Sequence, residues 1–280
     1  MKAKYLYWFG ATGVALALAA VAGANAEAGT KLKLGLRSRT QKEAGGDQWR
    51  EVTRATEWNP NETAIIICDL WDKHWCASAT RRCGELANGI APFVEQMRAR
   101  GVLIVHCPSD TMAFYQESPQ RKRMVEAPAA PDAPKDLGRW CRLDPAKEGK
   151  LPIDDSDGGC DDQPQCKNYK AWSREHPAVR VAEEDGVTDN GREVFNLFRQ
   201  RGIKNILYVG VHLNMCVLGR SFAIRQMTQL GFNCALVRDF TDTMYNPRQA
   251  PQVSHAEGTQ LMIEHVEKHW CPSVLSKEIH

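Results

Sequence analysis

The chain has 280 residues, of which 43% are hydrophobic, 25% charged and 8% aromatic. This composition excludes a disordered, collagen-like or coiled-coil protein and predicts one or two globular domains. The formal net charge is only +2, so the charge balance does not favour nucleic acid or an anionic membrane as a partner. Ten cysteines are too few for a small disulfide-dominated protein. They are numerous enough that their oxidation state depends on the compartment in which the protein resides.

The first 26 residues have the pattern of a secretory signal peptide. Lys2 and Lys4 precede an apolar run at residues 10–23, which ends at a small-x-small sequence at residues 24–26. The alternative is an uncleaved membrane anchor, but the run is shorter than the span of about 20 residues that a bilayer requires. We therefore expect cleavage after Ala26 and a mature protein that is exported, to a periplasm or as a secreted protein, without membrane association.

The first half of the mature chain predicts a polar extension, two buried strands and a helix. Residues 27–60 are expected to form an irregular N-terminal extension over a domain at residues 61–280. Residues 63–69 and 102–106 are apolar runs typical of strands buried on both faces. Apolar residues at helical spacing lie between them, at residues 86–97. Residues 108–176 are rich in proline and acidic residues, which indicates an insertion or lid.

Regular alternation of strands and helices resumes after the insertion. The expected strands cover residues 178–182, 205–211 and 234–238, and the expected helices cover residues 190–201, 216–230 and 249–269. Strands separated by helices of this length predict βαβ units and a parallel sheet covered on both faces. The predicted fold class is a doubly wound α/β domain, in which a ligand lies outside the carboxyl ends of the strands.

Two chemically capable residues come directly after predicted strands. Asp69 ends the strand at residues 63–69, and Cys216 follows a short turn after the strand at residues 205–211. The topology brings both to one crevice. A cysteine that begins a helix can have a lowered pKa and act as a nucleophile, whereas most buried cysteines are inert core residues. Asp69 could be the base for the thiol, or it could cap the following turn.

Two segments around these residues form a recognisable pattern. Residues 206–240 contain a strand, Gly-Val, a Cys-Val pair, a helix, Gly-Phe, a second strand and an aspartate, and residues 63–72 read TAIIICDLWD. Both segments resemble the isochorismatase-like cysteine hydrolases, a family that includes nicotinamidases and other amidases. The similarity covers roughly residues 60–107 and 176–270. It implies an isochorismatase-like, Rossmann-like three-layer fold and hydrolysis of an amide, imide or related C–N bond.

The resemblance also implies roles for individual residues. Cys216 would attack the electrophilic carbon, and Asp69 would take the thiol proton. The backbone N–H groups of His212 and Cys216 would form an oxyanion hole, next to a cis peptide bond between Val211 and His212. No cofactor is required by this chemistry, and the partner would be a small-molecule substrate. Because proteins of the resembled family often oligomerise, a homo-oligomer is also among the expected assemblies.

The third catalytic residue of the family, a lysine, has no counterpart in the sequence. No lysine lies between Lys170 and Lys204, and a gap-free count places Glu183 at this position. We expect Glu183 to take an altered acid/base role there, although a carboxylate beside Asp69 opposes thiolate formation. Lys73 or Lys170 could instead reach the crevice. The alternative hypothesis is a catalytically silent member that binds a small molecule or metal in the same crevice.

Metal binding is possible but not favoured by the sequence. The nicotinamidase metal site is not matched, because Met112 stands where a histidine would be needed. His, carboxylate and thiolate groups could ligate a metal in the crevice, the candidates being Asp69, Asp72, His74, Glu183 and Cys216. The acidic segment at residues 153–162 suits Ca²⁺ in composition, but it lacks the spacing of an EF-hand loop and is interpreted as a solvated loop.

The remaining expectations concern aromatic residues and cysteines. Trp71 and Tyr115 are candidates for a substrate-binding wall, or else they cover the core of the insertion. Cys68, Cys107 and Cys234 are expected to be reduced core residues. The other six cysteines, in loops and near the chain end, are expected to form three disulfides, and the suggested pairs are Cys76–Cys83, Cys160–Cys166 and Cys141–Cys271.

Overall fold

The computed structural model describes Met1, residues 30–43 and residues 45–280. The predicted signal peptide lies outside the described residues, apart from Met1. Among the described residues there is no helix both long and apolar enough to span a membrane.

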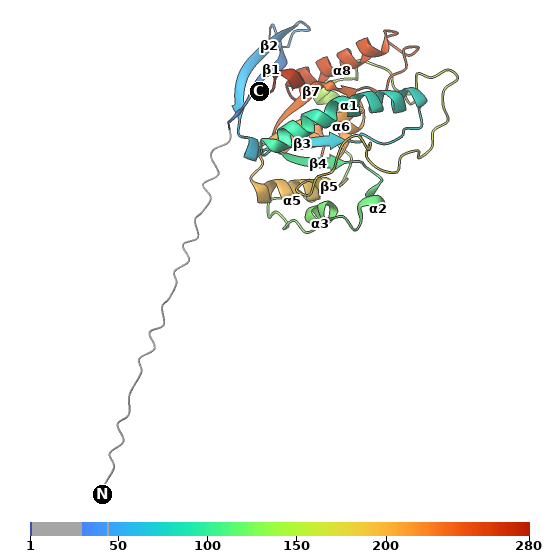
Figure 1. Cartoon of the computed structure of the whole chain (residues 1–280). Coiled ribbons are helices and arrows are strands. Elements are labelled where there is room, and N and C mark those ends of the chain that lie inside the picture. The colour runs from blue at the N-terminus through green and yellow to red at the C-terminus, as the bar shows by residue number, and fades with distance from the viewer. Residues whose placement is uncertain (2–29, 44) are drawn as a thin grey trace.

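An eight-stranded sheet forms the centre of the domain (Figure 1). Six strands are parallel: β3 (Thr63–Cys68), β4 (Leu103–Cys107), β5 (Gly186–Val187), β6 (Asn205–Val211), β7 (Asn233–Asp242) and β8 (Ser273–Val274). The hairpin strands β1 (Leu32–Gln41) and β2 (Trp49–Trp58) complete the order β2-β1-β8-β7-β6-β3-β4-β5. The predicted α/β class with a mostly parallel sheet is therefore confirmed.

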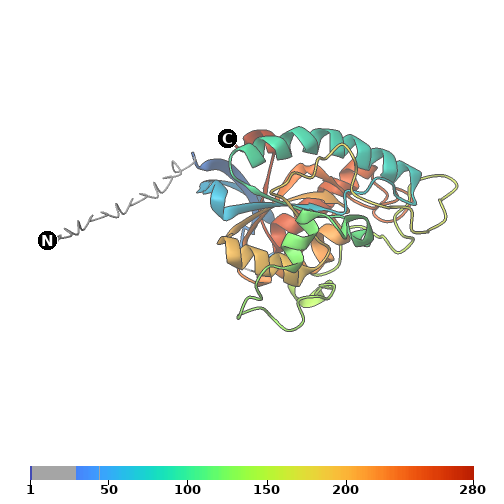
Figure 2. The same ribbon diagram turned by 60° about the horizontal axis from the view of Figure 1, so that its bottom comes forward.

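Helices cover both faces of the sheet, with α1 (Ala77–Ala99) on one side and α5 (Gly191–Arg201) on the other (Figure 2). Strand β3 shows why its sequence is a continuous apolar run. Ile65 and Ile67 belong to the core cluster under α1, whereas Ala64 and Ile66 belong to the cluster under α5 and α8 (His255–His269). Successive side chains of a strand point to opposite faces, so both faces must be apolar.

The sequence suggested an irregular N-terminal extension, but the structure shows an antiparallel hairpin there. Strands β1 and β2 pair over ten residues each, and Arg37 of β1 pairs with Ser273 of β8. The alternation of Leu32 and Leu34 with polar residues provides the buried face of β1. Only this one face meets the core, so the segment is polar on average and its period of two is easily overlooked.

Two other elements differ from expectation. The edge strand beside β4 is β5, a few residues after the predicted strand at residues 178–182. The helix predicted at residues 216–230 is two short helices, α6 (Cys216–Gly219) and α7 (Ile224–Gln229). The chain leaves the helical path at Arg220, which has an extended backbone conformation, and this break has consequences for the site.

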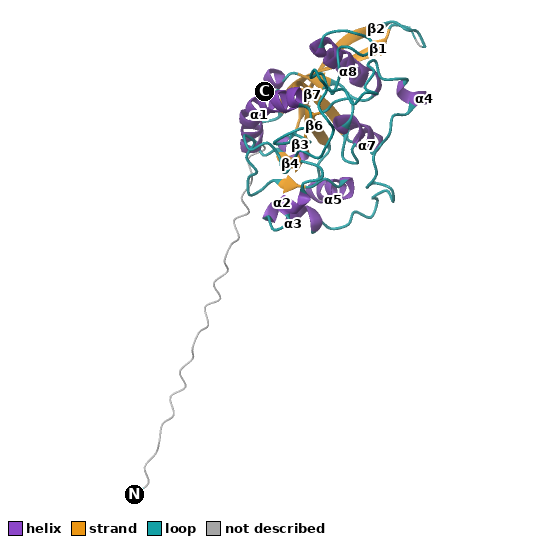
Figure 3. Ribbon diagram, turned by 90° about the vertical axis from the view of Figure 1, so that its right-hand side faces the viewer, coloured by secondary structure: helices purple, strands orange, loops and turns teal. Residues whose placement is uncertain are grey.

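The segment at residues 108–176 carries three short helices joined by loops, as Figure 3 shows in its teal connections. The helices are α2 (Met112–Tyr115), α3 (Pro119–Val125) and α4 (Pro145–Glu148). Glu148 anchors the segment by accepting hydrogen bonds from Arg225, His265 and Trp270 at 2.7–2.9 Å. Burial opposes ionisation of Glu148, but these donors outweigh it and lower its pKa to about 2.

A second buried anchor joins the end of this segment to β4. His106 lies between the carboxylates of Glu175, at 2.5 Å, and Asp185, at 2.9 Å, and Arg98 of α1 pairs with Asp185 at 2.7 Å. Burial alone would lower the pKa of His106, but the two carboxylates raise it to about 9. His106 is therefore an imidazolium at neutral pH, and each of its two ring N–H groups donates a hydrogen bond to a carboxylate.

All ten cysteines lie among the described residues, and none forms a disulfide. The prediction of three disulfides was therefore wrong for this structure. Cys83 lies on the inner face of α1 and packs against the sheet, whereas Cys76 precedes that helix and turns toward the loop that carries Cys160 and Cys166. The two residues were paired because they are close in sequence, but helix α1 directs Cys83 to the sheet and away from Cys76.

Candidate active site

The candidate site lies at the carboxyl ends of the two central strands, β3 and β6. These strands are neighbours in the sheet, and Cys68 pairs with Gly210 at their ends. A Cβ atom at Gly210 would lie 2.1 Å from the carbonyl oxygen of Cys68, so only glycine permits this approach of the two backbones. The two predicted residues that follow, Asp69 and Cys216, are thereby brought to one place.

Asp69 is fully buried and held on both carboxylate oxygens. Oδ1 accepts a hydrogen bond from the N–H of Ser109 at 2.7 Å, and Oδ2 accepts one from Nε of Arg220 at 3.0 Å. The Cys216 thiol lies close enough to this carboxylate for each group to shift the pKa of the other. Burial raises the pKa of Asp69, whereas Arg220, Cys216 and Ser109 all oppose that rise. A carboxylate held in this way is oriented to receive the thiol proton.

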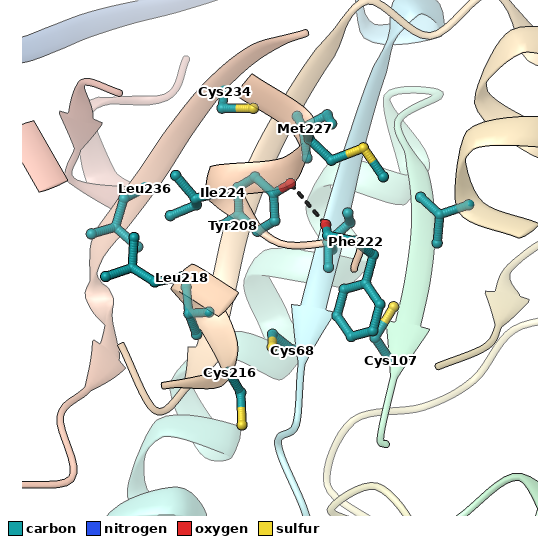
Figure 4. Close-up of a cluster of buried hydrophobic side chains, with 14 of the residues drawn as sticks. Cys68, Cys107, Tyr208, Cys216, Leu218, Phe222, Ile224, Met227, Cys234 and Leu236 are labelled. Carbon is teal, nitrogen blue, oxygen red and sulfur yellow. Dashed lines mark hydrogen bonds between the residues drawn. The ribbon is translucent and has the colours of Figure 1, made fainter. Parts of the chain in front are cut away.

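Cys216 begins helix α6 and is 8% exposed. Figure 4 shows its sulfur at the margin of the apolar cluster, directed away from Leu218. The peptide bond between Val211 and His212 is cis, as the family resemblance implied, and the backbone N–H of His212 lies near enough to the Cys216 sulfur to lower the pKa of the thiol. This N–H therefore lies where a negative charge on sulfur or on an adjacent oxygen would develop.

The thiol is not the low-pKa thiolate that the sequence suggested. Burial raises the pKa of Cys216 well above its usual value, and the Asp69 carboxylate raises it further, while Arg220 lowers it. Helix α6 has only four residues, so its dipole is too small to outweigh desolvation. The arrangement therefore suits transfer of the proton to Asp69 as the sulfur attacks, and not a thiolate formed in advance.

Arg220 is the site residue that sequence reasoning missed. Besides Asp69, its guanidinium contacts the carboxylate of Asp110 at 3.6 Å and lies over the ring of Trp140. It stands four residues after Cys216, and the break between α6 and α7 at this residue directs it back to Asp69. The sequence does contain a signal for this residue, because an arginine stands four residues after the candidate nucleophile. The assumption of one continuous helix at residues 216–230 concealed it.

Glu183 is not in the crevice, and its predicted catalytic role was wrong. It is exposed and precedes β5, so it lies toward the amino ends of the parallel strands, at the edge opposite Asp69. Lys73 is also exposed. Lys170 reaches only the carbonyl oxygen of Asp110, at 2.7 Å. Among the described residues, Arg220 supplies the positive charge that directly contacts the candidate base.

Aromatic rings gather beside this site. Trp71 is buried and stacks on Trp172 with ring centroids 4.2 Å apart, and His74 and His212 meet at 5.0 Å. Burial lowers the pKa of His74 to about 4 and that of His212 to about 3, so both rings are neutral at pH 7. Tyr115 is also buried, where its hydroxyl accepts from the N–H of Glu175; that contact gives it a structural role.

Some buried polar atoms in this region have no hydrogen-bond partner. Among the described residues they include Oγ of Ser109, Nε1 of Trp172 and Nε2 of His212. Buried polar atoms are rarely left unpaired in folded proteins. These three lie on segments adjoining Asp69, Trp71 and Cys216, and are therefore candidates for contact with a polar substrate.

The metal ligands suggested for the crevice do not converge. Asp72 accepts hydrogen bonds from the N–H and hydroxyl of Ser173 at 3.0 and 2.5 Å, which makes it part of a turn. In the acidic loop, Asp154 accepts from the N–H of Ser156, and Asp157 accepts from Asn246. These oxygens satisfy the local backbone and side chains.

Comparison with solved structures finds similar folds. A cysteine hydrolase from Pseudomonas syringae pv. phaseolicola 1448A and an isochorismatase from Pseudomonas putida KT2440 are each 14% identical, with a TM-score of 0.48, covering 79% of this chain and 91% of the other. An isochorismatase family protein from Burkholderia thailandensis is 15% identical, with a TM-score of 0.44, covering 78% of this chain and 94% of the other. No protein-family model matches the chain, and no curated protein matches it.

Proposed function

We propose that the protein is a cysteine hydrolase of the isochorismatase-like type, which cleaves an amide, imide or related C–N bond. The observation that carries the proposal is the proximity of the Cys216 thiol to the buried Asp69 carboxylate, near the N–H of His212, with Arg220 paired to Asp69 at 3.0 Å. A nucleophile, a base, an oxyanion donor and a charge that favours the ionised form of the base are the parts that covalent catalysis requires.

The proposed reaction begins when Cys216 attacks the substrate carbonyl carbon and its proton passes to Asp69. The carbonyl oxygen becomes an oxyanion beside the N–H groups of His212 and Cys216. Collapse of this intermediate breaks the C–N bond, and Asp69 returns the proton to the leaving nitrogen. Water then attacks the thioester with Asp69 again as base, which releases the acid and restores the thiol.

Arg220 makes Asp69 competent for this role. A buried carboxylate without a partner would be protonated at neutral pH and could not accept a proton. The guanidinium at 3.0 Å opposes that protonation. The loss of the family lysine was the reason to consider a catalytically silent binding protein, and Arg220 offers the missing charge from another segment.

A panel of small amides and imides tests the proposal. We expect the wild-type protein to hydrolyse at least one class, and Cys216→Ala and Asp69→Asn to abolish that activity. The matched control is Cys234→Ala, which removes a buried sulfur from β7 and is expected to retain activity. Activity that persists in Cys216→Ala would contradict the proposed nucleophile, and binding of a panel compound without turnover would favour the silent alternative.

We also propose that the protein is exported and that residues 1–26 are removed. The support is the charged start, apolar run and small-residue cleavage sequence. N-terminal sequencing of the protein recovered from its native compartment is expected to begin at Glu27, and a chain that still begins at Met1 would contradict this.

A further inference from the structure

Three sulfur atoms surround one carboxylate outside the candidate active site. Oδ2 of Asp162 lies 3.2 Å from Sγ of Cys76, 3.6 Å from Sγ of Cys160 and 3.2 Å from Sγ of Cys166. Cys76 and Cys160 are fully buried, and Cys166 is half-buried. We call these four residues the Cys3Asp cluster. It joins the loop at residues 160–166 to the residue that precedes helix α1.

The single oxygen Oδ2 has more donors than it can accept. The N–H of Ser78 also reaches it, at 3.0 Å. If the three sulfurs were thiols, four donors would compete for an oxygen with about two lone-pair sites. Three neutral thiols could not all donate to this oxygen at once, whereas deprotonated sulfurs so close to a carboxylate would require a cation among them.

The first turn of α1 provides donors for anionic ligands. The N–H of Ala79 donates to Sγ of Cys76 at 3.5 Å, and the N–H of Ala77 lies near the sulfur of Cys166. With Ser78, three successive N–H groups thus face ligand atoms of the cluster. Hydrogen bonds from the backbone to ligating groups are the usual surroundings of a bound metal, because they stabilise the negative charge of the ligands.

The distances from Oδ2 of Asp162 to the three sulfurs match the edges of a tetrahedral metal centre. With Zn–S near 2.3 Å and Zn–O near 2.0 Å, the sulfur-to-oxygen edge of a tetrahedron is about 3.5 Å. The three observed distances lie between 3.2 and 3.6 Å. Sγ of Cys76, Sγ of Cys160 and a carboxylate oxygen of Asp162 all lie within 4.8 Å of one another.

We propose that Cys76, Cys160 and Asp162 bind one zinc ion, and that Cys166, whose sulfur lies 3.2 Å from Oδ2 of Asp162, moves in as the fourth ligand when the ion binds. Four protein ligands close the coordination sphere, so the site is structural and leaves no position for substrate. Binding releases the protons of the thiols to solvent and leaves three Zn–S bonds and one Zn–O bond. The ion would fasten the loop at residues 160–166 to the start of α1. Met215, which precedes Cys216, packs against the same apolar cluster, so the ion also supports the segment that carries the candidate nucleophile.

Metal content and ligand identity test this proposal without an activity assay. Purified full-length protein is expected to contain one zinc per chain by elemental analysis. When apoprotein is titrated with Co²⁺, a sulfur-to-cobalt charge-transfer band is expected. Replacing Cys160 by serine or Asp162 by asparagine should weaken zinc binding at least about tenfold in competition with a chromophoric chelator. Cys141→Ser is the matched control, because Cys141 is half-buried and outside the cluster, and it should bind zinc as the wild type does.

Two results would overturn the proposal. One is a wild-type chain that takes up no zinc and shows no proton release when zinc is added. The other is a mass lower by a pair of hydrogen atoms, with a disulfide mapped between two of the three cysteines. If a variant fails to fold by circular dichroism, the proton release of the wild-type apoprotein on zinc addition still decides the question.

Discussion

Replacement of Arg220 by methionine tests the electrostatics of the candidate site most directly. Methionine keeps much of the length and apolar stem of arginine but removes the charge that lies 3.0 Å from Asp69 and lowers the pKa of Cys216. An opposite charge at this range shifts a pKa by about one to three units. The pKa of the Cys216 thiol is therefore expected to rise by about that amount in the variant.

The rate effect is smaller than the change in thiolate fraction. A rise of about one to three pKa units lowers the thiolate fraction roughly 10- to 1000-fold, but a more basic thiolate is a better nucleophile, with a Brønsted coefficient of about 0.45. The net expectation is alkylation of Cys216 that is roughly 3- to 50-fold slower at a fixed pH. The loss of Arg220 also favours protonation of Asp69, which would relieve part of this effect, and an Asp69→Asn background isolates the direct contribution of the guanidinium.

The assay is the rate of iodoacetamide labelling of Cys216, followed by peptide mass spectrometry. Cys141 in the same sample serves as an internal reference, and Arg220→Lys is the control that keeps the positive charge. Labelling of Cys216 that is unchanged or faster in Arg220→Met, with Cys141 unaffected, would refute the assigned role of the guanidinium.

Three further predictions concern stability and the covering of the site. The pKa of His106 is raised from 6.5 to about 9, so its protonation contributes on the order of 3 kcal/mol to the free energy of unfolding. This contribution is fully present below pH 6.5 and is lost as the pH rises through about 9. In urea unfolding, His106→Gln should therefore lose less stability over this pH range than the wild type. Glu148→Gln leaves Arg225 buried without a counter-charge, and should lower the free energy of unfolding by about 3–5 kcal/mol, whereas an unchanged urea midpoint would contradict the anchor. In Gly219→Ala a Cβ would lie 2.5 Å from the ring of Trp140, so the indole must move and its fluorescence spectrum should shift; an identical spectrum would show that the ring does not rest there.

The parallel core of the fold could be predicted from the sequence because its information is local. The apolar run of β3 and the helical spacing of apolar residues in α1 can each be recognised within a short stretch of sequence. Helix α5 begins after the cap residue Asn190 and ends at Gly202, which has a left-handed backbone conformation. The position of Asp69 beside Cys216 follows from the rule that carboxyl ends of parallel strands share one edge. These inferences need no knowledge of the loops.

The features that could not be predicted depend on contacts between segments that are distant in the sequence. The role of Arg220 follows from the break in helical backbone between α6 and α7, which the apolar spacing of residues 216–230 conceals. Glu183 was placed by counting residues, and a count cannot detect that the segment before β5 lies at the other edge of the sheet. Cysteine pairing failed for the same reason, because Cys76 meets Cys160 across the insertion and not its neighbour on α1.

The hairpin at the start of the described chain carries a consequence for the order of assembly. Strand β1 joins the sheet through Ser273 of β8, and Lys33 exchanges backbone hydrogen bonds with His280. Strand β1 can pair with β2 as soon as the hairpin is synthesised, but it takes its place in the sheet only when residues 273–280 are present. Contacts of such long sequence separation slow folding. The sheet is therefore completed only after β8 is in place, and removing residues 273–280 would release β1 from one of its two neighbours.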